Sequence, residues 1–84
     1  MLKTVKMLVT ADHNTTMGNH NVRISGDERR FTYHSTVICF VNDRMRVFST
    51  DNGGWNTMST NRAINDYRRY FLGLGYKDLN AEKE

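Results

Sequence analysis

The stretch TVICFVNDRMRVFS, residues 36–49, decides the fold that we expect for this chain. Residues 36–41 are β-branched or apolar on both faces, which is typical of a central strand that is covered on both sides. Asn42 and Asp43 favour a tight turn. Residues 44–49 alternate between polar and apolar side chains, so the whole stretch predicts an antiparallel β-hairpin.

Three stretches upstream of this hairpin also have strand-like patterns. Residues 2–10 alternate loosely, residues 21–25 carry β-branched side chains on one face, and residues 30–34 alternate aromatic with polar side chains. We expect a strand at each of the three. Residues 11–20 consist mostly of turn-forming side chains and predict a loop.

One amphipathic helix is predicted downstream. The pair Gly53–Gly54 ends the hairpin, because glycine adopts positive φ without steric cost. Ser59 or Thr60 is well placed to cap a helix, and Gly73 and Gly75 are stop signals. An apolar stripe of helical period lies between them, at Ala63, Ile64, Tyr67, Tyr70, Phe71 and Leu74.

The fold class that follows is α+β: a small antiparallel β-sheet of three to five strands, packed by one C-terminal amphipathic helix. A chain of 84 residues has room for one domain, and we expect this domain over residues 1–76. Residues 77–84 are polar and predict a flexible C-terminal tail.

The charge of the chain mildly favours anionic partners. Twelve basic residues, most of them arginine, outweigh nine acidic residues and give a net charge of +3. Arginine forms bidentate contacts to carboxylates and to phosphates alike. The charge therefore does not choose between a protein and a nucleic acid as the partner.

The expected location is the cytoplasm. The only cysteine, Cys39, cannot form an internal disulfide, and a small domain without disulfides fits a reducing compartment. The N-terminal residues lack the apolar run of a signal peptide. No stretch approaches the ~20 apolar residues that span a bilayer, so we expect a soluble protein with no membrane partner.

Neither a metal site nor a catalytic site is expected. The available soft metal ligands are His13, His20, His34 and Cys39. They lack the short paired spacing of zinc sites, and Cys39 is expected to be a buried small hydrophobe. No nucleophile-elbow, P-loop or paired-carboxylate pattern surrounds Asp12–His13 or Ser35–Thr36. We predict no cofactor and no enzymatic activity.

A basic and aromatic surface is the main candidate binding site. Arg62 and Arg69 are seven residues apart and project from one helix face, whereas Arg44 and Arg46 would share a strand face. If the two faces adjoin, they form a patch that grips phosphates and stacks on bases. Its members are Arg62, Arg68, Arg69, Arg44 and Arg46, flanked by Tyr67 or Tyr70. The competing interpretation is a solvated face balanced by Asp43, Asp51 and Asp66.

A second basic cluster lies on the predicted N-terminal strands, at Lys6, Arg23, Arg29 and Arg30. Asp27 and Glu28 adjoin this cluster and partly cancel its field. We therefore expect a solvated surface here rather than a binding site.

Trp55 is expected to be a structural anchor. Tryptophan is highly buried on average, so we predict that Trp55 is wedged between sheet and helix and sets their angle. On that interpretation Trp55→Ala costs on the order of 3–5 kcal/mol of stability. The alternative is an exposed aromatic binding residue beside Arg62.

Two segments carry a family resemblance. The first is Tyr33-His34-Ser35-Thr36-Val37-Ile38, and the second, residues 53–65, reads Gly-Gly-Trp-x-Thr-x-Ser-Thr-x-Arg-x-x-Asn. Together they resemble small bacteriophage accessory proteins of uncharacterised function, which share a Tyr-x-x-Thr strand, a GGW-x-T turn and a T-x-R-x-x-N helix start. The likeness covers about residues 31–71. It implies an early-expressed phage protein that binds a host factor, a defence system or DNA, and it brings no catalytic residues.

The predicted function is that of a non-enzymatic, phage-encoded protein that docks on a host protein and modulates or inhibits it, in host takeover or anti-defence. The alternative is a nucleic-acid-binding protein, for example of single-stranded DNA, that uses the arginine and aromatic patch. A homodimer formed along a strand edge or the helix, and a structural virion component, stay open.

Overall fold

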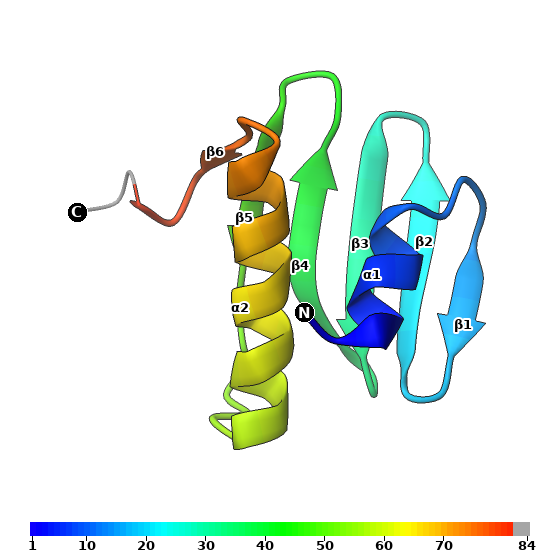
Figure 1. The fold of residues 1–84 in the computed structure, drawn as a ribbon, viewed down its shortest axis with the longest axis vertical. Coiled ribbons are helices and arrows are strands. Elements are labelled where there is room, and N and C mark those ends of the chain that lie inside the picture. Colours follow the sequence, from blue (N-terminus) through cyan, green and yellow to red (C-terminus); the bar gives the residue numbers. More distant parts are fainter. Residues whose placement is uncertain (82–84) are drawn as a thin grey trace.

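A six-stranded sheet forms the main layer of the protein in the computed structural model, which describes residues 1–81 (Figure 1). The strands follow one another in chain order across the sheet. Strands β1 to β5 pair antiparallel, whereas β6 runs parallel to β5. The strands are Thr15–Met17 (β1), His20–Ser25 (β2), Glu28–Tyr33 (β3), Thr36–Asn42 (β4), Val47–Thr50 (β5) and Lys77–Asp78 (β6). The predicted α+β class is confirmed. The strand number exceeds the three to five expected, and β6 makes the sheet mixed.

Two helices, α1 (Lys3–Val9) and α2 (Met58–Gly73), cover the same face of this sheet (Figure 1). Their apolar sides and the inner face of the sheet share one core. Its buried members are Val5, Leu8, Val9, Val22, Phe31, Ile38, Cys39, Val41, Phe48, Ala63, Ile64, Tyr67 and Phe71. No helix of residues 1–81 lies over the opposite face of the sheet. None of the helices in that range is long and apolar enough to cross a membrane.

The predicted strand over residues 2–10 is wrong, because this segment is helix α1. Val5, Leu8 and Val9 are buried, and their i, i+3, i+4 spacing fits one face of a helix. The start of α1 is attached to α2, since the backbone amide of Leu2 donates to the Asp66 carboxylate at 2.6 Å. This contact joins the two helices above the sheet.

The predicted hairpin of residues 36–49 is confirmed as β4 and β5, with a longer turn than expected. The turn takes in residues 43–46. The Asn42 side chain accepts from the backbone amide of Met45 at 3.0 Å, and Arg46 has a positive φ of 56°. Arg44 and Arg46 therefore lie in a turn and not on a strand face.

A β-bulge interrupts the pairing of β3 with β4. Phe31 pairs with Cys39, but the next residue, Thr32, pairs with Val37 and leaves Ile38 as the extra residue. Both Ile38 and Cys39 are buried, as expected of Cys39 from its sequence. A bulge of this kind changes the direction in which the following side chains point.

Helix α2 has its N-cap two or three residues before the caps predicted for it. Thr57, rather than Ser59 or Thr60, is the N-cap, and its hydroxyl oxygen accepts from the Thr60 amide at 3.2 Å. The predicted apolar stripe is confirmed at four positions: Ala63, Ile64, Tyr67 and Phe71 are buried. Tyr70 is only half-buried, and Leu74, the C-cap residue, is exposed.

The segment after α2 folds back onto the sheet, although a flexible tail was predicted over residues 77–84. Lys77–Asp78 pairs with β5 as β6, and the Leu79 amide donates to the Phe48 carbonyl at 2.8 Å. Asn80 accepts from the Thr50 amide through its side chain at 2.7 Å. Residues 82–84 of the predicted tail lie outside the described residues.

Candidate binding pocket

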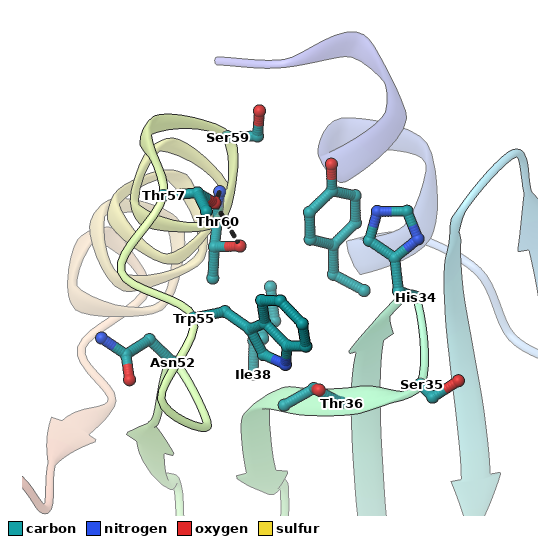
Figure 2. Close-up of a pocket in the computed structure, with 10 residues that line it drawn as sticks. His34, Ser35, Thr36, Ile38, Asn52, Trp55, Thr57, Ser59 and Thr60 are labelled. Carbon is teal, nitrogen blue, oxygen red and sulfur yellow. Dashed lines mark hydrogen bonds between the residues drawn. The ribbon is translucent and has the colours of Figure 1, made fainter.

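A pocket of about 570 Å³ opens between the tip of the β3–β4 hairpin and the start of α2 (Figure 2). In Figure 2, His34 stands on one side of the Trp55 indole, Thr57 and Thr60 lie on the helix side, and Ile38 lies at the back. The volume falls within the range of ligand pockets, roughly 300–1,000 Å³. The lining residues are Tyr33, His34, Ser35, Thr36, Ile38, Asn52, Trp55, Thr57, Ser59 and Thr60.

The pocket is built from two separate segments, residues 33–38 and 52–60. The first is the segment 33–38 quoted above for its expected resemblance, and the second overlaps the other quoted segment, residues 53–65. The two meet where Gly53 lies against the side chain of Thr36, so closely that a β-carbon on Gly53 would overlap the Thr36 methyl group. Residues from both segments therefore line one pocket.

Asn52 and its neighbours hold the turn that presents Trp55. The side chains of Asp51 and Asn52 accept from the amides of Gly53 and Gly54, each at 2.9 Å. The Trp55 amide donates to the Asn52 carbonyl at 2.9 Å. Such side-chain turns restrict the backbone locally, so the indole is carried on an ordered turn.

Trp55 is 61% exposed, and the predicted wedge between sheet and helix is therefore wrong. The turn projects the indole outward as a wall of the pocket, and the helix instead packs on the sheet through Tyr67 and Phe71. An exposed tryptophan on a concave surface is typical of binding sites. The alternative considered for Trp55, an exposed aromatic, is the one that fits its position.

The opposite wall is an aromatic cluster around Tyr33. Its ring stacks on His20 with centroids 4.4 Å apart and lies 4.3 Å from the ring of His34. His34 has a positive φ of 56°, and its amide donates to the Asn19 carbonyl at 2.7 Å. Burial, with a smaller contribution from the charge of His34, lowers the pKa of His20. This environment therefore favours the neutral form of the His20 imidazole.

The polar groups of the pocket are hydroxyls, the Asn52 amide, the His34 imidazole and the Trp55 indole N–H. The Thr57 hydroxyl donates to the Thr60 hydroxyl at 2.9 Å, while Ser35 and Ser59 are exposed at the rim. No Asp, Glu, Lys or Arg is among the described residues that line the pocket. The site is thus suited to an uncharged apolar or aromatic group that also takes hydrogen bonds at its edge.

The arginines of the patch predicted from the sequence lie in different places, and two of them contact other parts of the chain. Arg68 pairs with Asp78 at 3.4 Å. Arg46 donates to the Leu74 carbonyl and lies 4.7 Å over the Tyr76 ring. Arg44 is exposed in the β4–β5 turn. None of these three side chains lines the depression that Arg62 and Arg69 line.

Arg62 and Arg69 do lie together, beside a shallow depression on the outer side of α2 that also includes Met58, Asn61, Asn65 and Asp66. No ion pair joins Arg62 or Arg69 to another residue within the described chain.

The two tyrosines of the predicted patch belong to the packing of α2. Tyr67 is fully buried in the core, so it is not a surface residue as the patch required. Tyr70 packs edge-on against Phe71.

The second basic cluster is also divided. Arg29 points inward, with its side chain only 13% exposed, and makes two hydrogen bonds of 2.7 Å to Asp43. It also donates to the Val9 carbonyl at 2.9 Å. Arg23 and Arg30 are exposed and lie on the sheet. Arg29 is therefore a structural residue of β3 that ties α1 to the β4–β5 turn.

Sequence reasoning did not place Tyr33, His34 and Asn52 in a site with Trp55. The two motifs that contain most of these residues were a usable signal, but nothing in their spacing of about twenty residues showed that they meet. Within residues 1–81, no group of three or more His, Cys, Asp and Glu side chains is placed to hold a metal ion.

Comparison with known proteins gave no match to this chain among family models, curated proteins or solved structures.

Proposed function

We propose that this chain is a non-catalytic binding protein that docks on a partner protein and receives an apolar or aromatic side chain of that partner in the Trp55 pocket. The observation that carries the proposal is the position of Trp55, which is 61% exposed at a pocket whose other walls are aromatic, aliphatic and hydroxyl-bearing.

The energetic reason is the apolar area that a partner would cover. A tryptophan buries roughly 150–250 Å² when it is fully enclosed. At about 25 cal/mol per Å², covering the exposed part contributes on the order of 2–4 kcal/mol. Residues with contributions of this size are the few that dominate protein interfaces.

The kind of partner comes from the resemblance to phage accessory proteins. On that basis the partner is a host protein, bound in the host cytoplasm, and binding modulates or inhibits it. The absence of charged side chains from the described lining of the pocket supports recognition by shape and apolar contact, with charge acting elsewhere on the surface.

The proposal is tested by affinity capture from a bacterial host lysate, with and without nuclease treatment. The wild-type chain is expected to retain one stoichiometric protein in both treatments. Trp55→Ala is expected to lose it, because the pocket loses its largest apolar wall. Met58→Ala is the matched control, since Met58 is 88% exposed and close in sequence but does not line the pocket. Capture that survives Trp55→Ala, or repeated capture of nothing, contradicts the proposal.

The second candidate function is nucleic-acid binding, and the observation in its favour is the pair Arg62 and Arg69. Both are exposed on the outer side of α2, where no ion pair engages them in the described chain. If the chain binds nucleic acid through this pair, the charge reversals Arg62→Glu and Arg69→Glu would abolish the capture of partners from the lysate. Nuclease treatment would abolish the capture as well. Binding through the Trp55 pocket predicts neither result.

A further inference from the structure

The face of the sheet that carries no helix has a row of four side chains running directly across it. In the strand register, Arg23 of β2 is opposite Arg30 of β3, Arg30 is opposite Phe40 of β4, and Phe40 is opposite Ser49 of β5. Directly opposite residues point to the same side of a sheet. Their sequence neighbours Val22, Phe31, Cys39, Val41 and Phe48 are in the core, so this row faces outward.

The two guanidinium groups are adjacent, an arrangement that costs stability on its own. Like charges directly opposite each other on neighbouring strands repel. Arg30 is partly compensated, because it pairs with Glu28 at 3.2 Å and lies 5.2 Å over the Phe40 ring. Arg23 is exposed and has no ion pair with any described residue. The row therefore holds one positive charge that the described part of the fold does not neutralise.

The remaining side chains beside the row favour an anion with flat groups attached. Among the described strand residues, Glu28 is the only acidic one that shares this face with the two arginines, and the positions beside the row include the neutral hydrogen-bonding residues Asn21, Ser25 and Thr32. Arg30 stacked on Phe40 presents a flat guanidinium surface that is already held in place. Phosphates and planar bases are complementary to such a surface.

We infer that this sheet face binds single-stranded nucleic acid, with Arg23 and Arg30 contacting phosphates and the Arg30–Phe40 pair stacking a base. A single strand is the occupant because its bases are free to stack, whereas those of a duplex are paired and enclosed. This surface is on the opposite side of the sheet from the helices, and the inference does not depend on the Trp55 pocket or on Arg62 and Arg69.

The test is fluorescence anisotropy with a labelled oligothymidylate of about 15 nucleotides, at about 50 mM salt. The wild-type protein is expected to bind with a dissociation constant of about 1–100 μM, and the affinity should fall as salt rises. Arg23→Ala is expected to weaken binding about 3–10-fold and to reduce the slope of log affinity against log salt by about 0.7, the loss of one phosphate contact. Arg23→Gln keeps the length of the side chain and should give the same result if the alanine variant folds poorly.

Two variants serve as controls in the same titration. Lys3→Ala removes an equal charge from the exposed side of α1, and Met45→Ala alters an exposed side chain in the β4–β5 turn; both are expected to bind the oligonucleotide as the wild-type protein does. A duplex of the same length is expected to bind at least about threefold more weakly. Polyglutamate should compete poorly, because it offers no bases to stack.

Four results would overturn the inference: no binding by the wild-type chain at low salt, wild-type affinity in folded Arg23 variants, an equal loss in Lys3→Ala, or preference for the duplex. Displacement by polyglutamate as efficient as displacement by unlabelled oligothymidylate would also overturn it, because the face would then recognise negative charge on any polymer.

Discussion

Gly53 and Thr36 are in direct contact across the base of the pocket, although they come from opposite ends of the β4–β5 hairpin segment. Gly53 has a φ of +62°, and a β-carbon there would overlap the Cγ2 methyl of Thr36. Both the backbone conformation and the space therefore require glycine. This contact brings the two motif segments together.

We predict that Gly53→Ala destabilises the fold through both causes. The left-handed conformation costs a non-glycine residue about 1–2 kcal/mol, and overpacking against Thr36 adds about 1–3 kcal/mol. Gly18→Ala is the matched control, because Gly18 has the same φ of +62° but open space around it. Denaturant unfolding of both variants separates the steric cost from the conformational cost.

The same prediction can be checked by a rescue. Thr36→Ser removes the methyl group that a β-carbon on Gly53 would meet, so Gly53→Ala should be less destabilising in the Thr36→Ser background than in the wild-type chain. Equal costs for Gly53→Ala and Gly18→Ala, together with no rescue, would mean that the contact has no steric importance.

Trp55→Ala is expected to change the free energy of unfolding by less than about 1 kcal/mol, because the side chain is largely exposed. Phe48→Ala is the comparison, since Phe48 is fully buried and its truncation should cost about 3–5 kcal/mol. Thermal and denaturant unfolding measure both. A loss for Trp55→Ala as large as that for Phe48→Ala would place the indole inside the core.

Thr57→Ala should destabilise the protein by about 1 kcal/mol, because Thr57 is the N-cap of α2 and accepts from the Thr60 amide. Ser59→Ala is the control: Ser59 is exposed, and no side-chain hydrogen bond of it is seen in the described chain. Its effect should stay within about 0.5 kcal/mol. If Ser59→Ala proved the more destabilising change in urea unfolding, the helix start predicted from the sequence would be correct after all.

Asp43 is expected to contribute to the pH dependence of stability. Burial alone would raise the pKa of Asp43, but hydrogen bonds from Arg29 and Tyr76 and the nearby charges of Arg29 and Arg46 lower it overall. Because the pKa is lower in the folded state, the stabilisation is fully present above the ordinary aspartate pKa of about 4. It is lost as the pH falls through the folded-state value.

Asp43→Asn therefore should cost about 1–3 kcal/mol near neutral pH and should make the unfolding free energy depend less on pH below about 4. Glu28→Gln is the control, because the Glu28–Arg30 pair is about half exposed on both sides and such pairs contribute at most about 1 kcal/mol. Urea unfolding at several pH values measures both variants. If the unfolding free energy of Asp43→Asn fell with decreasing pH as steeply as that of the wild-type protein, another carboxylate would be responsible for the loss of stability in acid.

The sheet and the long helix were predictable because their patterns are strong and local. The run of residues 36–41 is short and rich in β-branched side chains, which favours a strand, and the stripe from Ala63 to Phe71 has the helical period. Residues 2–10 were misassigned because Val5, Leu8 and Val9 fit a helix as well as the loose alternation fits a strand. Short segments of this kind take whichever structure buries their apolar side chains against the rest of the fold. The sequence alone does not show which structure that is.

The candidate site was less predictable than the fold, because its position depends on contacts between distant segments. The average burial of tryptophan suggested a core position for Trp55, but the turns at Asp51 and Asn52 carry it outward. Spacing placed Arg62 and Arg69 on one helix face, and both line the same depression. It could not show that Arg46 and Arg68 have partners in the C-terminal segment, since that segment returns to β5 only through tertiary pairing.

The bulge at Ile38 has a consequence for related chains and for redesign. A regular strand alternates inside and outside at every step, so the extra residue in β4 reverses the alternation for everything closer to the hairpin tip. Thr36 points to the same side as Tyr33, because the two residues are directly opposite each other. A variant that lacks Ile38 would keep this pairing and restore regular alternation from Thr36 to Cys39, so the threonine of the Tyr-x-x-Thr motif would still face inward. The pocket would instead lose Ile38, which lines it. A sequence match to the motif should therefore be counted as a shared pocket only where the extra residue between Thr36 and Cys39 is also kept.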